Sequence, residues 1–129
     1  MTFTQAELDY FATQSLGRLA TVSPTGQVQN SPVGFFYNPD EKCIDIGGHG
    51  LGESKKFRNV QAGSTVALVV DDLVSFNPWT VRGVEIRGVA EALTDVEPPV
   101  PGFSRELLRI RPVKIITWGL DGPPSNRTV

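Results

Sequence analysis

The chain has 129 residues, a formal net charge of −2 and 40% hydrophobic residues, which suits one domain with an ordinary core. This charge balance argues against a general nucleic-acid binder, since such proteins usually present a strongly basic surface. One cysteine, Cys43, and one histidine, His49, exclude a disulfide within the chain and a cysteine-rich zinc site. Because the sequence has neither a signal-peptide pattern nor an apolar run of membrane length, we expect a cytoplasmic protein with no membrane partner.

The first predicted element is a helix. Thr4 and Glu7 have the spacing of a capping box, and Phe3 and Leu8 occupy the two positions of a hydrophobic staple around it. Apolar residues recur at helical spacing and stop before Gly17, where the period changes. We therefore expect a short amphipathic helix ahead of the first strand.

The rest of the chain has mostly strand patterns, joined by turns of hairpin length. The predicted strands are residues 19–22, 27–36, 43–48, 67–70, 84–92 and 113–118. Short helices are expected at residues 55–62 and 104–109, and Pro78 and Trp79 mark a loop. Antiparallel strands in this order predict a mainly β domain with short helices over residues 1–120, closed as a barrel or a split barrel. Residues 121–129, rich in Gly, Pro, Ser and Asn, are expected to form a disordered tail.

The segment with the clearest chemical pattern follows the third predicted strand. Residues 47–54 include four glycines, and Ser54 is a suitable N-cap for the helix that follows. Lys55 and Lys56 stand in the first turn of that helix, where each cation opposes the helix macrodipole by about 0.3–1 kcal/mol. A bound anion would reverse the sign of this effect. Two interpretations therefore remain open: a phosphate site, or solvated lysines on a short surface helix.

Other candidate residues carry a weaker signal. His49 is either a hydrogen-bond donor to a ligand or an ordinary loop residue, and Asp71 with Asp72 is either a catalytic pair or the polar end of a strand. Trp79 and Trp118 either stack on a planar ligand or pack in the core or an interface. The sequence contains no P-loop, no dinucleotide fingerprint and no evident catalytic triad. We therefore assign no catalytic residue.

Four stretches of the sequence together resemble one known family. They are residues 17–22, 29–33, 54–60 and 66–71, which read GRLATV, QNSPV, SKKFRNV and VALVVD. In this order they resemble the pyridoxamine 5′-phosphate oxidase-like family of FMN-binding split barrels, over residues 5 to 120. The short length and the run Lys-x-x-Arg-Asn at residues 55–59 are similar to the actinobacterial branch that uses the deazaflavin coenzyme F-420.

The resemblance implies a six-stranded antiparallel split β-barrel that forms a homodimer, with the cofactor in a groove at the interface. It implies coenzyme F-420 as the cofactor, with FMN as the alternative, and Lys56 as the main phosphate ligand. Trp79 and Arg82 would reach the cofactor from the other subunit. The full set of implied cofactor-binding residues is Gln29, Ser31, Val33, Gly48, His49, Ser54, Lys55, Lys56, Asn59, Trp79 and Arg82.

The implied activity is that of an oxidoreductase that transfers hydride between the cofactor and a small planar organic substrate. Two alternatives stay open: an FMN-dependent oxidoreductase of the same fold, or a non-catalytic carrier of a flavin, a deazaflavin or a tetrapyrrole. The chain is much shorter than true pyridoxamine phosphate oxidases and lacks their C-terminal extension, so oxidation of vitamin B6 is not expected. Neither a metal ion nor nucleic acid is expected as a partner.

Overall fold

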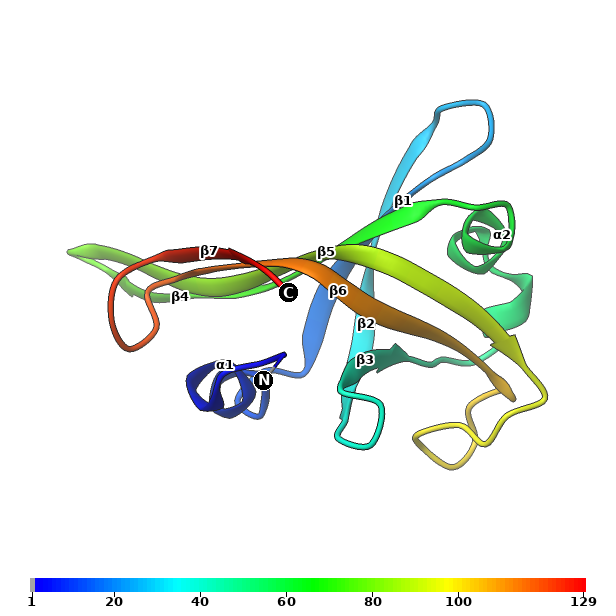
Figure 1. Cartoon of the computed structure of the whole chain (residues 1–129), viewed down its shortest axis with the longest axis horizontal. Coiled ribbons are helices and arrows are strands. Elements are labelled where there is room, and N and C mark those ends of the chain that lie inside the picture. Colours follow the sequence, from blue (N-terminus) through cyan, green and yellow to red (C-terminus); the bar gives the residue numbers. More distant parts are fainter. Residues whose placement is uncertain (1) are drawn as a thin grey trace.

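The computed structural model describes residues 2–129, which form a mainly β molecule (Figure 1). The helices are α1 (Gln5–Phe11), the 3-10 turn η1 (Leu51–Glu53) and α2 (Lys55–Gln61). The strands are β1 (Leu16–Val22), β2 (Val28–Asn38), β3 (Cys43–Ile46), β4 (Thr65–Phe76), β5 (Trp79–Thr94), β6 (Glu106–Trp118) and β7 (Ser125–Thr128). Within residues 2–129, no helix combines the length and the apolar character that a membrane span requires.

Six of the strands form a closed ring. Their order is β3-β2-β1-β4-β5-β6, each neighbouring pair is antiparallel, and β3 also pairs with β6. Ile46 of β3, for example, lies opposite Phe35 of β2 on one side and Leu108 of β6 on the other. Ring closure removes the open strand edges on which other chains can pair. The prediction of a six-stranded antiparallel split barrel is therefore confirmed.

The interior of the ring is filled by the inward-facing side chains of the strands. In β1, Leu19 and Thr21 are buried, whereas Arg18 and Val22 on the opposite face are exposed. The other strands contribute fully buried apolar residues to the same core: Ile44, Ile46, Leu68, Val70, Val84, Ile86, Leu108, Ile110 and Ile115.

Helix α1 packs on this core and begins as the sequence predicts. Thr4 Oγ1 accepts a hydrogen bond from the Glu7 N–H at 3.2 Å, and Glu7 Oε1 accepts one from the Thr4 N–H at 3.0 Å, which completes the capping box. Phe3 and Phe11 are both buried, and their rings meet edge to face at 5.6 Å. Phe3 also meets Tyr37 of β2 edge to face at 5.7 Å, and Phe11 meets Phe35 of β2 at 5.7 Å, so these rings attach α1 to the barrel.

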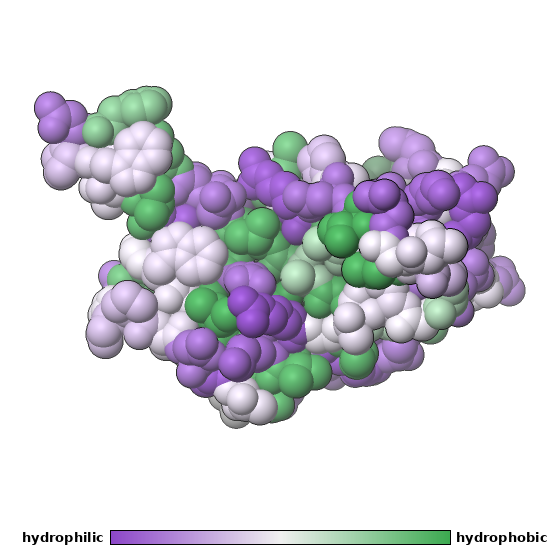
Figure 2. Space-filling view, turned by 90° about the horizontal axis from the view of Figure 1, so that it is seen from above, coloured by the Kyte–Doolittle hydropathy of each residue, from purple (hydrophilic) through white to green (hydrophobic). Residues whose placement is uncertain are grey.

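Strands β4 and β5 continue beyond the ring as a two-stranded arm, defined here as residues 71–83 (Figure 1). The loop expected at Pro78 and Trp79 is only the tip of this hairpin, because Trp79 already pairs with Phe76. The two aromatic rings lie 6.0 Å apart in an edge-to-face arrangement, a cross-strand contact that favours strand pairing. The arm stands clear of the body of the molecule (Figure 2).

Residues 104–109, expected as a short helix, include instead the start of β6. Leu108 lies opposite Ile46 and Arg109 opposite Asp45, so this segment pairs with β3 and helps to close the ring. The Arg109 guanidinium also forms an ion pair with the Asp45 carboxylate, with an N–O distance of 3.0 Å. Because β3 is distant in the sequence, the local pattern did not reveal this pairing.

The C-terminal segment also differs from the prediction of a disordered tail. Strand β7 pairs with β6, with Ser125 opposite Thr117 at one end and Thr128 opposite Lys114 at the other. Arg127 forms an ion pair with the buried carboxylate of Glu7 on α1. The prediction is wrong for these residues because it rested on composition, whereas β6 and α1 hold the segment in place.

Candidate functional site

Helix α2 is anchored so that part of its surface is left free. Ser54 is its N-cap, as predicted: Ser54 Oγ accepts a hydrogen bond from the Phe57 N–H at 3.3 Å and donates one to the Leu51 carbonyl at 2.6 Å. The Phe57 side chain is 1% exposed and fixes the inner face of the helix in the core. Lys55 and Arg58, which are three positions apart, therefore share an exposed side of the helix.

That side of α2 faces the hairpin between β1 and β2 across a cleft of about 630 Å³, called here the cationic cleft. Lys55, Arg58 and Asn59 line it from the helix, and residues 23–25 and 27–29 line it from the hairpin. Of the arginines in residues 2–129, Arg58 alone forms no ion pair with a carboxylate, and Lys55 forms none either. Two cations without carboxylate partners suit the cleft to an anion such as phosphate.

A chain of side-chain hydrogen bonds ties the two walls of the cleft together. Asn59 Nδ2 donates to Thr21 Oγ1 at 3.0 Å, and the Thr21 hydroxyl donates to Gln29 Oε1 at 3.4 Å. Asn59 is 5% exposed and Thr21 is 2% exposed, so these groups are shielded from water. The contact fixes α2 against β1 and β2, and it brings two of the predicted site residues, Gln29 and Asn59, to the same place.

Ser31 is the next residue on the same face of β2 as Gln29, since side chains two positions apart share a face. Its hydroxyl oxygen is buried and has no hydrogen-bond partner among residues 2–129. Buried polar atoms without partners are rare in folded proteins. A polar ligand atom would satisfy this hydroxyl. Val33, two positions further, is 5% exposed and belongs to the core.

Lys56, which the family resemblance implies as the main phosphate ligand, is not among the residues that line the cationic cleft. It is half-buried, whereas Lys55 is exposed on the side of the helix that also carries Arg58. The sequence analysis did not place Arg58 in the site. Its spacing of three from Lys55 on a helix is the signal that could have identified it.

Gly48 and His49 lie at the end of β3 and contact the connector before β6. The Gly48 carbonyl accepts hydrogen bonds from the Ser104 N–H at 3.0 Å and the Ser104 hydroxyl at 2.9 Å. His49 Nδ1 lies 3.2 Å from the Gly102 carbonyl oxygen, and its ring meets Phe103 edge to face at 5.0 Å. Neither residue lines the cationic cleft.

Trp79 and Arg82 lie on the arm and not in the cationic cleft. Trp79 is 68% exposed at the arm tip. Arg82 donates to Asp72 from Nε at 2.8 Å and from Nη2 at 3.2 Å, and its guanidinium lies 5.0 Å from the centre of the Tyr10 ring. Trp118 packs at the base of the arm, where a Cβ on Gly83 would come within 2.5 Å of its ring.

Asp71 and Asp72 do not form a catalytic pair. The Asp71 carboxylate forms an ion pair with Arg18 at 3.0 Å, and the Asp72 carboxylate pairs with Arg82 and accepts the Tyr10 hydroxyl at 2.7 Å. Hydrogen bonds from Arg82 first, and then from Tyr10, lower the pKa of Asp72. The interpretation of these residues as the polar end of a strand is also wrong, because β4 continues through both of them to Phe76. Each aspartate instead forms an ion pair with an arginine.

The remaining candidates offer no reactive centre. Burial raises the pKa of the Cys43 thiol to about 11, so this side chain is protonated and unreactive at neutral pH. Across residues 2–129, no three potential metal ligands come together.

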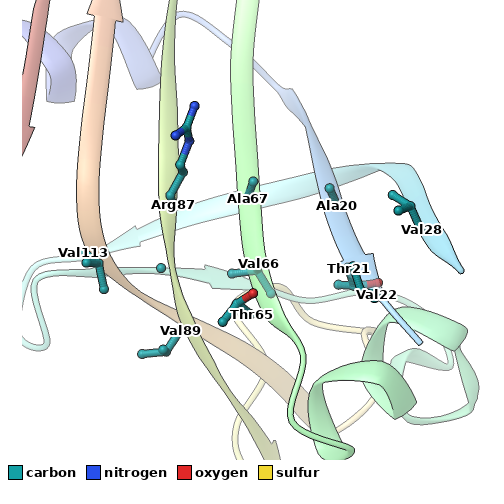
Figure 3. A pocket seen from close by; sticks show the side chains of 11 residues that line it. Ala20, Thr21, Val22, Val28, Thr65, Val66, Ala67, Arg87, Val89 and Val113 are labelled. Atoms are coloured by element: carbon teal, nitrogen blue, oxygen red, sulfur yellow. The ribbon is translucent and has the colours of Figure 1, made fainter. Parts of the chain in front are cut away.

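An apolar groove of about 430 Å³ runs across the outer face of the sheet. Its exposed side chains include Val22, Val28, Val89 and Val113, and Figure 3 shows them with their neighbours across the strands of the ring. Val28 lines both this groove and the cationic cleft, so the two hollows adjoin. An exposed apolar patch next to a cationic cleft is typical of a surface that a ligand or a partner covers.

A family model described as pyridoxamine 5′-phosphate oxidase matches residues 3–119. The chain belongs to this family. Within the family, it is 44% identical over 126 residues to the 5a,11a-dehydrotetracycline/5a,11a-dehydrooxytetracycline reductase of Streptomyces rimosus, an alignment that covers 97% of this chain and 89% of the relative. The expected family and enzyme class are confirmed: this member of the pyridoxamine 5′-phosphate oxidase family is an oxidoreductase.

Solved structures with little sequence similarity share the fold of this family member. A conserved hypothetical protein of Mycobacterium tuberculosis superposes with a TM-score of 0.70 at 20% identity, covering 91% of this chain and 85% of that structure. A protein titled F-420 reductase superposes with a TM-score of 0.59 at 24% identity, covering 79% of this chain and 89% of that structure.

Proposed function

We propose that the protein is a coenzyme F-420-dependent reductase that acts on a planar, conjugated organic substrate. The observation that carries this proposal is the cationic cleft, in which Lys55 and Arg58 face the β1–β2 hairpin without carboxylate partners. The run Lys-x-x-Arg-Asn, which contains these two residues, is the one that resembles the deazaflavin branch of the family. The Streptomyces relative supports the substrate class, since its name gives a dehydrotetracycline, a polycyclic compound, as substrate.

In this proposal, Lys55 and Arg58 hold the cofactor phosphate, with Ser54 and Lys56 next to them in the chain. A guanidinium binds a phosphate through two parallel hydrogen bonds, and an ammonium adds a point charge, so the two side chains complement each other. Asn59 has an indirect role in this proposal: its amide donates a hydrogen bond to Thr21 Oγ1 and so fixes the wall of the cleft. The same arrangement suits the phosphate of FMN, which keeps FMN as the alternative cofactor.

The residues of β2 fit the ring end of such a cofactor. The buried Ser31 hydroxyl lacks a partner in the described chain, and the Gln29 side chain lies next to it on the same face of the strand. When bound, the cofactor supplies the hydride, and the protein supplies orientation and exclusion of water. In this proposal Ser31 and Gln29 orient the ring, while Val33 contributes to the apolar packing beneath it. Gly48 and His49, which follow β3, would contact the cofactor as the family resemblance implies.

We further propose that the active form is a homodimer in which a second copy covers the apolar groove. Val22 is 42% exposed, Val28 60%, Val89 49% and Val113 49%. Burial of a valine side chain is worth about 1.5–3 kcal/mol, so a self-complementary contact over this groove would stabilise a dimer. Because the groove adjoins the cationic cleft, the partner would border the cofactor site. Trp79 is exposed on the arm and is free to reach the partner's site, as the family resemblance implies, with Arg82 behind it.

Two measurements test the proposal. Titration of the purified protein with coenzyme F-420 and with FMN, followed by ring fluorescence, reports the cofactor; we expect saturable binding of coenzyme F-420. Steady-state turnover of reduced coenzyme F-420 with a 5a,11a-dehydrotetracycline reports the reaction; we expect oxidation of the coenzyme only when the substrate is present. Saturable binding of FMN alone would overturn the choice of cofactor. Tight cofactor binding without turnover on a panel of activated alkenes would favour the non-catalytic carrier.

A further inference from the structure

The glycine-rich segment that leads into α2 is held by Ser104, which lies in the connector just before β6. The Ser104 hydroxyl donates to the Gly48 carbonyl at 2.9 Å, and its oxygen accepts a hydrogen bond from the Leu51 N–H at 3.0 Å. The Ser104 N–H donates to the same Gly48 carbonyl at 3.0 Å. Ser104 therefore bridges the two ends of the turn formed by residues 48–51.

A second contact lies beside the first. The Gly52 N–H donates to Glu106 Oε1 at 2.9 Å. A Cβ on Gly52 would lie 3.0 Å from Glu106 Cδ, so the absence of a side chain at this position lets the carboxylate come close. We call Ser104 and Glu106 the β6 clamp. Together they bind the N–H groups of Leu51 and Gly52, at the start of η1.

The β6 clamp connects directly to the N-cap of α2. The Leu51 N–H is bound by Ser104, and the Leu51 carbonyl accepts both the Ser54 N–H at 3.0 Å and the Ser54 hydroxyl at 2.6 Å. Ser54 Oγ in turn accepts the Phe57 N–H. A continuous series of hydrogen bonds thus runs from Ser104, just before β6, through η1 to the first turn of the helix that carries Lys55.

We propose that Ser104 and Glu106 are positioning residues for the anion site of the cationic cleft. This inference rests on the proposed function, because it concerns how the cofactor phosphate is held. The glycines of residues 47–52 give the segment many accessible conformations, and the clamp selects the one that places the first turn of α2, which carries Lys55, at the cationic cleft. Within residues 2–129, neither Ser104 nor Glu106 forms a hydrogen bond or an ion pair with Lys55 or Arg58. The clamp acts through the backbone of residues 48–54.

The expected effect follows from the fraction of molecules in the binding-competent conformation. If removal of a clamp contact leaves that fraction near one in ten, the apparent dissociation constant for a phosphate-bearing ligand rises about 10-fold. A ligand without the phosphate does not use Lys55. Its affinity should therefore stay unchanged, which separates positioning of the anion site from a general loss of structure.

The test measures the affinity of coenzyme F-420 and of its phosphate-free deazaflavin chromophore for matched variants. We expect Ser104→Ala to raise the dissociation constant of coenzyme F-420 about 10-fold and to leave that of the phosphate-free chromophore unchanged. Ser104→Thr, which keeps a hydroxyl, should restore the affinity. Ser125→Ala, which also removes a hydrogen-bonded hydroxyl but on β7, should leave both affinities unchanged. Glu106→Ala serves as the second variant if Ser104→Ala does not fold.

The outcomes separate this inference from the proposed function. Equal losses for both ligands, or no loss for either, would overturn the positioning role while wild-type binding and turnover still support the reductase. If the wild-type protein binds FMN instead, the cofactor proposal fails, and FMN compared with riboflavin tests the clamp in the same way. A wild-type protein that binds no phosphorylated cofactor overturns both.

Discussion

Arg127 and Glu7 join the two ends of the chain through a bidentate ion pair. The Arg127 guanidinium donates from Nη1 to Glu7 Oε2 at 2.6 Å and from Nη2 to Glu7 Oε1 at 2.7 Å. The Glu7 side chain is 2% exposed and also accepts the Thr4 N–H in the capping box of α1. One residue of β7 therefore neutralises the buried carboxylate on which the first helix depends.

Removal of this partner should destabilise the fold. Arg127→Met leaves the buried Glu7 carboxylate without a counter-charge, which costs about 3–5 kcal/mol. The measurement is the free energy of unfolding in urea. Glu7→Gln combined with Arg127→Met should recover much of the loss, because the uncompensated charge is gone. Arg105→Ala is the matched control: its pair with Asp95 has side-chain exposures of 60% and 94%, so we expect a change below about 0.5 kcal/mol. Equal losses of unfolding free energy for Arg127→Met and Arg105→Ala would show that burial of the Glu7 carboxylate does not make its ion pair important.

The two cations of the cationic cleft should matter more for cofactor binding than Lys56. Lys55→Ala and Arg58→Ala should each raise the dissociation constant of the phosphorylated cofactor about 10-fold or more, since a charge-assisted hydrogen bond contributes roughly 1.5–3 kcal/mol. Lys56→Ala should have a smaller effect, because Lys56 does not line the cleft. Fluorescence titration at two salt concentrations provides the measurement. If Lys56→Ala raises the dissociation constant more than the other two substitutions, Lys56 is the main phosphate ligand, as the family resemblance implies.

Ser31 offers a test in which stability and binding change in opposite directions. Its buried hydroxyl has no partner in the described chain, so Ser31→Ala should leave the cofactor-free protein as stable or stabilise it by up to about 1 kcal/mol. The same substitution should weaken cofactor binding about 5- to 10-fold, because the ligand loses a hydrogen bond. Thermal unfolding and fluorescence titration of one protein preparation measure both effects. A destabilised protein with normal binding would contradict a ligand role for Ser31.

The arm should lose stability in acid through Asp72. Hydrogen bonds from Arg82 and from Tyr10 lower the pKa of this carboxyl below its usual value of 3.8. The ionised Asp72 carboxylate therefore contributes fully to the free energy of unfolding above about pH 4, and this contribution is lost as the pH falls through the lowered pKa. Asp72→Asn should make the thermal midpoint less sensitive to pH between 5 and 3 than in the wild type. Asp95→Asn, at a carboxylate that is 94% exposed, should leave the pH profile unchanged. If the thermal midpoint of Asp72→Asn depends on pH as in the wild type, the Asp72–Arg82 pair does not cause the loss of stability in acid.

A charge placed on the apolar groove should dissociate the proposed dimer. Val89→Glu puts a carboxylate among Val22, Val28 and Val113, and two copies of it would face one another across a symmetric contact. We expect a monomer by light scattering at micromolar concentration and a loss of cofactor affinity. Ala12→Glu places the same charge at the exposed C-cap of α1, outside both the groove and the arm, and should leave the mass unchanged. A wild-type protein that is already a monomer would overturn the dimer.

The sequence by itself determined the features that depend on near neighbours along the chain. The capping box of Thr4 and Glu7, the N-cap at Ser54 and the alternation of buried and exposed residues in β1 are set by spacings of two to four residues, so local rules predict them. The order of these elements, together with the resemblance of four short stretches, was sufficient to predict the barrel fold and the family. The chemical class followed from that family.

Only the tertiary structure decided which side chains meet. The cationic cleft needs α2 to pack against the β1–β2 hairpin, and this contact selects Arg58 over Lys56 as the partner of Lys55. The ordered β7 depends on Arg127 reaching Glu7 at the other end of the chain. In both cases the free energy comes from burial and hydrogen bonding between segments far apart in sequence, which local propensity does not encode. Such contacts, rather than the glycine-rich loop alone, define the site proposed for the cofactor.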